Sequence, residues 1–130
     1  MKASSINEAN NFIAGWYIDK SICDNLIEYF EQNPNKVEGK CGSKNLVKKE
    51  IKESMDVGLT PYSPLKLIQD YLSELKKVLE EYIKLYPNCS RTQDYWGLIS
   101  DFQIQRYLPK QGFHKIHCER NGYGQSLNRF

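Results

Sequence analysis

The sequence contains no long hydrophobic run. Its longest uncharged apolar stretch, residues 12–18 (FIAGWYI), is seven residues long, whereas a membrane-spanning helix needs about 20. The start of the chain, MKASSINEANNF, also lacks the apolar core of a secretory signal. We therefore expect no membrane segment and a cytoplasmic location.

Neither sign of charge is in large excess. Lys and Arg number 18 and Asp and Glu number 16, which gives a net charge of +2. A surface dedicated to nucleic acid or to anionic lipid normally carries a larger positive excess or a concentrated basic patch. The composition therefore predicts no dedicated nucleic-acid surface.

Closely paired cysteines are also missing. The four cysteines are widely spaced, without a C-x-x-C motif, at Cys23, Cys41, Cys89 and Cys118. Structural zinc sites usually draw on such pairs, so a zinc module built on Cys118 and His117 is only a minor alternative. Because no secretory signal is present, we expect a reducing compartment and free thiols.

What the chain does contain is enough apolar material for one domain, predicted to span residues 1–130. The hydrophobic fraction is 40%, and nine Tyr, five Phe and two Trp supply core volume. Hydrophobic spacing predicts helices over Ser21–Gln32 and Pro64–Tyr86. It predicts strands over Phe12–Ile18, Phe102–Tyr107 and His114–Glu119, and the beginning of another at Leu127–Phe130.

The helix boundaries follow from capping residues. Ser21 is the expected N-cap of the first helix, with Asp24 three residues on as a weak capping box. Ser63 and Pro64 are expected to open the second helix. That helix carries an apolar stripe, and we expect it to bury its aliphatic members against the sheet: Ile68, Leu72, Leu75 and Leu79.

The segments between these elements are less regular. Val37–Lys48 is predicted to be a loop, and Gly58–Pro64 is predicted to be irregular. The charged stretch Lys48–Val57 fits either a solvated strand or a helical turn, and the sequence does not decide between them. Pro109–Gly112 is predicted to be a turn.

The only two histidines, His114 and His117, fall in one short segment, QGFHKIHCERN. On a strand, side chains two residues apart share a face, so His117 and Glu119 would point the same way. An imidazole and a carboxylate side by side are two of the three ligands of a 2-His-1-carboxylate iron site. His114 is expected to face the other side.

The residues around this H-x-E motif resemble a known family. Gln105-Arg106-Tyr107-Leu108-Pro109, then Gly112-Phe113, then His117-Cys118-Glu119 follow the order strand, turn, strand. This stretch resembles the prolyl-4-hydroxylase-like branch of the 2-oxoglutarate/Fe(II) oxygenases, particularly its phage and environmental members. Lys52-Glu53-Ser54-Met55-Asp56 and Gly15-Trp16-Tyr17-Ile18-Asp19 resemble further segments of that branch.

The resemblance implies a fold, a cofactor and site residues. The fold would be α+β, with N-terminal helices packed on part of an antiparallel double-stranded β-helix, or jelly roll. His117 and Glu119 would bind Fe(II), and Tyr107 and Phe113 would line the 2-oxoglutarate pocket. The implied activity is a dioxygenase that hydroxylates a peptide or a small molecule.

The chain departs from the family pattern in two ways. Glu119 stands where the family usually places Asp. The second iron-binding His and the basic partner of 2-oxoglutarate are expected tens of residues further on, but the sequence stops eleven residues after Glu119. We therefore expect an oxygenase-like fold that is incomplete at its C-terminus, with weak metal affinity and little or no turnover.

A second hypothesis treats the chain as a non-catalytic interaction or structural domain. An incomplete jelly roll would leave strands with open edges, and unpaired strand edges recruit other chains. We therefore expect self-association, with a homodimer as the simplest closed assembly.

Overall fold

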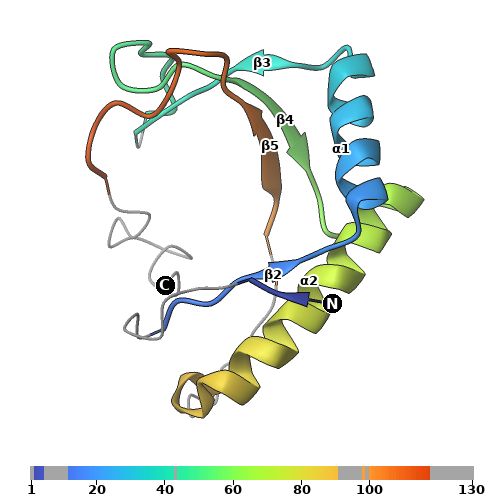
Figure 1. The fold of residues 1–130 in the computed structure, drawn as a ribbon. Helices are drawn as coiled ribbons and strands as arrows, with labels where there is room; N and C mark the ends of the chain where they lie inside the picture. Colours follow the sequence, from blue (N-terminus) through green and yellow to red (C-terminus); the bar gives the residue numbers. More distant parts are fainter. Residues whose placement is uncertain (1, 5–11, 43, 91–97, 99, 118–130) are drawn as a thin grey trace. The chain divides into compact units, whose positions relative to one another are not determined.

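A computed structural model describes residues 2–4, 12–42, 44–90, 98 and 100–117. Figure 1 shows the elements in chain order: β1 (Lys2–Ala3), β2 (Trp16–Tyr17), α1 (Lys20–Gln32), β3 (Val37–Glu38), β4 (Met55–Leu59), α2 (Lys66–Leu85), the 3₁₀ helix η1 (Pro87–Ser90) and β5 (Phe102–Arg106). Helices and strands are thus mixed, as predicted. Within the described ranges, no helix combines the length and the apolar character needed to cross a bilayer.

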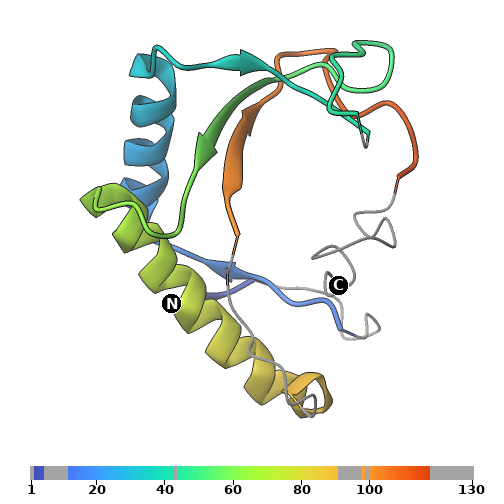
Figure 2. The same ribbon diagram turned by 180° about the vertical axis from the view of Figure 1, so that it is seen from behind.

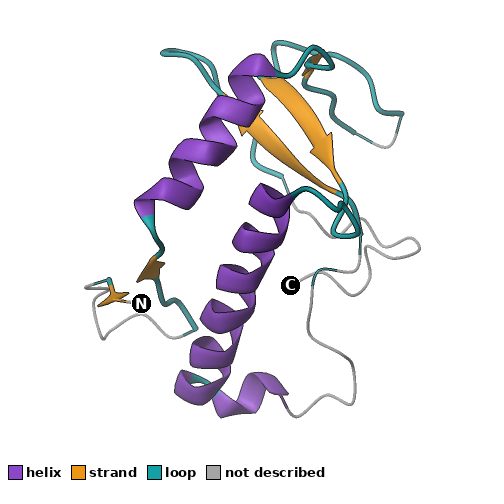
Figure 3. Ribbon diagram, turned by 90° about the vertical axis from the view of Figure 1, so that its right-hand side faces the viewer, coloured by secondary structure: helices purple, strands orange, loops and turns teal. Residues whose placement is uncertain are grey.

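The strands form two antiparallel sheets. In the first, β1 pairs with β2, and Lys2 lies opposite Tyr17. The second has the order β3-β4-β5, and Val37 of β3 lies opposite Asp56 of β4. β4 and β5 lie side by side when the molecule is seen from either side (Figures 1 and 2), and their arrows run in opposite directions in Figure 3.

The chain folds into two compact units. The first comprises Met1–Asn35 and Val57–Ile104, and the second comprises Lys36–Asp56 and Gln105–Phe130. Both helices belong to the first unit, whereas β3 belongs to the second. The single domain expected over residues 1–130 stays a prediction.

Helix α1 begins one residue earlier than predicted because its N-cap is Asp19 and not Ser21. One carboxylate oxygen of Asp19 accepts hydrogen bonds from the Ser21 N–H at 2.8 Å and from the Ser21 hydroxyl at 2.7 Å. These hydrogen bonds lower the pKa of Asp19 below its ordinary value of 3.8. Asp24 forms an ion pair with Lys20 at 2.6 Å instead of closing a capping box. The predicted end at Gln32 is confirmed.

Helix α2 begins at Lys66, two residues later than predicted, and ends at Leu85, one residue earlier than predicted. The Ser63 hydroxyl accepts a hydrogen bond from the Leu65 N–H at 3.3 Å, so Ser63 orders the approach to the helix without capping it. Of the predicted apolar stripe, only Ile68 is fully buried. The other aliphatic members are half-buried: Leu72, Leu75 and Leu79.

The predicted strand Phe12–Ile18 is reduced to Trp16–Tyr17. Upstream of it, Phe12 adopts a positive φ of 61°, which is incompatible with a strand. The Phe12 carbonyl oxygen accepts a hydrogen bond from the hydroxyl of Tyr82 in α2 at 2.7 Å, and the Ile13 carbonyl oxygen accepts one from the hydroxyl of Tyr86, the C-cap of α2, at 3.0 Å. Long-range tyrosine contacts therefore replace the strand ladder that the local sequence suggests.

Aromatic contacts hold the first unit together. The Tyr71 ring of α2 stacks on Phe102 of β5, with centroids 6.2 Å apart. Trp16 of β2 meets Tyr82 of α2 edge-on, with centroids 6.5 Å apart. Among the described residues, the buried hydrophobic side chains all belong to this unit: Phe30, Val57, Leu59 and Ile68.

Within the described residues of the second unit, the buried side chains are polar. They are Lys52, Ser54 and Asp56, which fall in the stretch that the sequence left undecided. The structure makes the end of that stretch a strand, β4, which continues through Gly58 and Leu59 into the segment predicted to be irregular.

The predicted strand His114–Glu119 is not formed over its described residues, 114–117. Among these residues and Phe113 before them, strand-like pairing is limited to the isolated bridge between Phe113 and Lys52, whose hydrogen bonds include one from the His114 N–H to the Ile51 carbonyl. The pairing stops there because residues 48–51 form a turn, closed by a hydrogen bond from the Ile51 N–H to the Lys48 carbonyl at 2.9 Å. The predicted turn at 109–112 is confirmed, with a positive φ of 74° at Lys110.

Candidate functional site

The second unit brings two separate sequence motifs together. Lys52, from the K-E-S-M-D segment, pairs with Phe113, which precedes the H-x-E motif, in an antiparallel bridge. The His114 N–H donates a hydrogen bond to the Ile51 carbonyl at 2.7 Å. Backbone hydrogen bonds therefore join two segments that lie some sixty residues apart in the sequence. The candidate site is built around this pairing.

One side of this site is a buried polar chain. The Lys52 ammonium lies 2.6 Å from Oδ2 of Asp56, and the Ser54 hydroxyl donates to Oδ1 of Asp56 at 2.7 Å. The residues occur at every second position of an extended segment, which places all three on one face. Buried charges are costly unless they are paired and hydrogen-bonded, and here both carboxylate oxygens have a partner.

Gly39 makes room for this chain. Its N–H donates a hydrogen bond to the Ser54 carbonyl at 2.9 Å, so the two backbones lie close together. A β-carbon at residue 39 would overlap the Ser54 hydroxyl oxygen and crowd the end of the Lys52 side chain. The glycine is thus required by close approach and not by its backbone angles.

The other side of the site is an open pocket of about 520 Å³. Phe113 and His117 line it together with the apolar side chains of Leu46 and Ile51. Its remaining lining includes three exposed lysines from two segments of the unit, Lys44, Lys48 and Lys115. The pocket therefore combines an apolar surface with positive charge.

The geometry of His117 suits a metal ligand. Its ring stacks on Phe113, with centroids 3.7 Å apart and an angle of 16° between the planes. Its Nδ1 lies 3.1 Å from the Lys115 carbonyl oxygen. Because a carbonyl can only accept, Nδ1 carries the proton in this contact, which leaves the lone pair on Nε2. Histidines that bind metals commonly donate their other ring N–H in this way.

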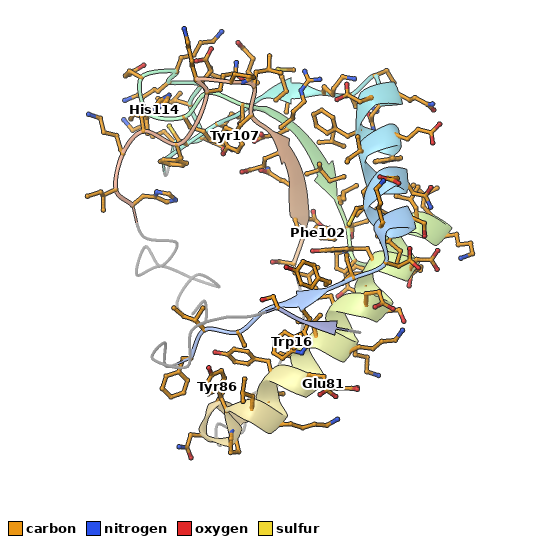
Figure 4. All side chains as sticks on the ribbon, in the orientation of Figure 1. Trp16, Glu81, Tyr86, Phe102, Tyr107 and His114 are labelled. Atoms are coloured by element: carbon orange, nitrogen blue, oxygen red, sulfur yellow. The ribbon has the colours of Figure 1, made fainter. Side chains whose placement is uncertain are left out.

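The structure does not bring all the predicted site residues together. Tyr107 is absent from the residues that line the described part of the pocket, and its hydroxyl donates to Gln105 at 3.0 Å. His114 is exposed and does not line the pocket either. Figure 4 labels both residues. Glu119 and Cys118 lie outside the described residues, so the roles expected for Glu119 and Tyr107 stay predictions.

Among the residues that the structure describes, no three His, Cys, Asp or Glu side chains converge as a metal site would require. This search covers His117 but not Glu119, the second ligand expected from the sequence. The described donors therefore supply one of the expected ligands.

Sequence reasoning missed two features of this site. The first is the burial of Lys52 and Asp56, although polar residues at alternate positions of K-E-S-M-D could have suggested one shared face. The second is the grouping of Lys44, Lys48 and Lys115, which depends on the long-range pairing of residues 52 and 113. No local sequence pattern predicts that pairing.

The charge of the pocket contrasts with that of its surroundings. Lys49, next to Lys48 in the sequence, forms an ion pair with Glu38 at 2.8 Å. The hydrogen bond to Glu38, together with its negative charge, raises the pKa of Lys49 above its ordinary value. No such ion pair is found for Lys44, Lys48 or Lys115 within the described part of the chain.

Comparison with known proteins adds no assignment to this geometry. No family model matches the sequence, and neither a curated protein nor a solved structure shows significant similarity to the chain.

Proposed function

We propose that the chain carries part of the iron site of an Fe(II)/2-oxoglutarate-dependent dioxygenase of the prolyl-4-hydroxylase type. His117 and Glu119 would be the protein ligands, and Phe113 would contact the bound cofactor. The observation that carries this proposal is the setting of His117, whose ring is stacked on Phe113 and hydrogen-bonded to a carbonyl at the edge of a pocket. In the same proposal the sheet β3-β4-β5 is part of a jelly roll.

The donor set fits Fe(II) in chemical type. Imidazole and carboxylate are the ligands of non-haem iron sites that leave positions open for a co-substrate. Bound Fe(II) with 2-oxoglutarate would supply the oxidising chemistry of hydroxylation. The residues of this chain would hold His117 in the orientation that metal binding needs. The Lys115 carbonyl fixes the tautomer of His117, and Phe113 fixes the plane of its ring.

The proposal includes weak metal affinity. The sequence contains only two histidines, and His114 does not line the pocket. Two protein ligands leave most metal positions to water, so we propose little or no 2-oxoglutarate turnover by this chain. The substrate class proposed from the family resemblance is a peptide or a small molecule.

Two further sequence-based expectations belong to this proposal. A cytoplasmic location is supported by the three described cysteines, Cys23, Cys41 and Cys89, which are free thiols. The homodimer stays a prediction, and sedimentation velocity at micromolar concentration tests it.

Manganese binding tests the proposed function. Mn(II) accepts the same oxygen and nitrogen ligands as Fe(II) without oxidising in air, and its binding can be followed by titration calorimetry. We expect weak binding that strengthens when 2-oxoglutarate is added, is lost in His117→Ala and Glu119→Gln, and is retained in His114→Ala. Equal binding by the His117 and His114 variants would contradict the proposal.

A further inference from the structure

We propose that the pocket lined by Phe113 and His117 binds a small organic acid that has an apolar body, with its carboxylate at Lys44, Lys48 and Lys115. The binding requires no metal. That this acid is the substrate of the site, and not only a ligand, rests on the proposed oxygenase function.

The first argument is charge. Three lysines line this pocket, and none of its described lining residues is acidic. Two neighbouring lysines of the same unit are already paired: Lys49 lies 2.8 Å from Glu38 and Lys52 lies 2.6 Å from Asp56. A carboxylate in the pocket would therefore meet positive charge that no described carboxylate compensates, and charge-assisted hydrogen bonds are stronger than neutral ones.

The second argument is the apolar surface between those lysines. Ile51 and Phe113 are half-buried, whereas Leu46 is 46% exposed and Ile116 is fully exposed. All four line the pocket. A ligand with a hydrocarbon or aromatic body would remove this surface from water, which is favourable in proportion to the apolar area covered.

Size and shape complete the argument. The volume of about 520 Å³ falls within the range of roughly 300–1,000 Å³ typical of small-molecule sites. The stacked Phe113–His117 pair, in which His117 is exposed, adds an aromatic surface to the lining. A short dicarboxylate would leave the apolar lining uncovered, and a neutral apolar molecule would leave the lysines without a partner. An aryl carboxylate would cover the apolar lining and also pair with the lysines.

Amide correlation spectra of the metal-free protein test the proposal with three probes: phenylbutyrate, the neutral phenylbutanol and the short dicarboxylate glutarate. We expect phenylbutyrate to bind about tenfold more tightly than phenylbutanol, because hydrogen bonds to charged groups contribute that much. Its largest shifts should fall at Ile51 and Phe113. Equal affinity for the acid and the alcohol would overturn the role of the lysines, and tighter binding of glutarate would overturn the role of the apolar lining.

Matched variants test whether the three pocket lysines attract the carboxylate. Replacing Lys44, Lys48 and Lys115 together by Met should remove the roughly tenfold preference for the acid. The control replaces three lysines that already form ion pairs, namely Lys49, Lys66 and Lys84, and should keep the preference despite the same loss of net charge. A preference lost equally in both variants would show long-range attraction only and would contradict the site.

Cys41 provides a readout in the unmutated protein. This free thiol lines the pocket, whereas the free thiol Cys23 lies on α1 in the other unit. Bound phenylbutyrate should slow alkylation of Cys41 by iodoacetamide and leave Cys23 unaffected. Unchanged alkylation of Cys41 at saturating acid would contradict the proposal even where the manganese site is intact.

Discussion

The ammonium group of Lys52 lies 2.6 Å from the carboxylate of Asp56, and both side chains are almost completely buried, with 4% and 3% exposed. The same carboxylate accepts a hydrogen bond from Ser54. In the second unit this polar chain occupies the place that aliphatic side chains usually take. The backbone that carries it also pairs with Phe113, so the polar chain supports the bridge that positions Phe113 in the pocket.

Removing one member of this buried pair should be strongly destabilising. Lys52→Met preserves much of the side-chain volume but leaves the Asp56 carboxylate buried without its cation. We expect a loss of about 3–5 kcal/mol in the free energy of unfolding, measured by urea denaturation.

The matched control for that variant is Lys66→Met. Lys66 forms an ion pair with Asp70 at the same distance of 2.6 Å, but its side chain is 86% exposed. Exposed pairs contribute at most about 1 kcal/mol. Equal losses of stability in the two variants would show that burial of the Lys52–Asp56 pair does not make the loss of one partner more costly.

Gly39 and Gly58 offer a second matched pair. Gly39→Ala would place a β-carbon against the Ser54 hydroxyl, whereas a β-carbon at Gly58 would meet no atom within 4 Å. Overpacking of this kind costs about 1–3 kcal/mol, so Gly39→Ala should lower the melting temperature and Gly58→Ala should not. A harmless Gly39→Ala would show that the two backbones are not as close as described.

The apolar stripe of α2 should respond unevenly to truncation. Ile68 is fully buried and Leu75 is half-buried. Ile68→Ala should cost about 2–5 kcal/mol, and Leu75→Ala should cost clearly less because part of its side chain already contacts water. Chemical denaturation of both variants checks the order, and a larger loss for Leu75→Ala would reverse it.

The N-cap of α1 should make stability depend on pH. Hydrogen bonds from Ser21 lower the pKa of Asp19 in the folded protein. Its contribution is therefore fully present above the ordinary value of 3.8 and is lost as the pH falls through the lower folded value. Asp19→Ala should lower the melting temperature at neutral pH, and the difference from wild type should shrink in strong acid. A difference that is constant with pH would contradict a charged cap.

The helices were predictable because their signals are local. The apolar spacing located α2 to within two residues at its start, and the end of α1 at Gln32 was correct. The alternation at β5 was also correct: Phe102, Ile104 and Arg106 are less exposed than Gln103 and Gln105.

The remaining strands were less predictable because distant partners decide them. The hydroxyls of Tyr82 and Tyr86 donate hydrogen bonds to the carbonyls of Phe12 and Ile13, and these contacts shorten the first predicted strand. The turn at residues 48–51, next to the bridge between Lys52 and Phe113, limits the strand predicted after residue 112. In the candidate site, the sequence singled out Phe113 and His117, which the structure does bring together, but nothing local indicated that three lysines would join them.

The most direct test of the proposed iron site is paramagnetic line broadening by Mn(II) in amide correlation spectra, recorded with 2-oxoglutarate present. Broadening should begin at His117 and spread first to Phe113 and Lys115, which contact it, and it should disappear in His117→Ala. Broadening that begins elsewhere, for example at the acidic residues of α2, and persists in His117→Ala would contradict the proposed site.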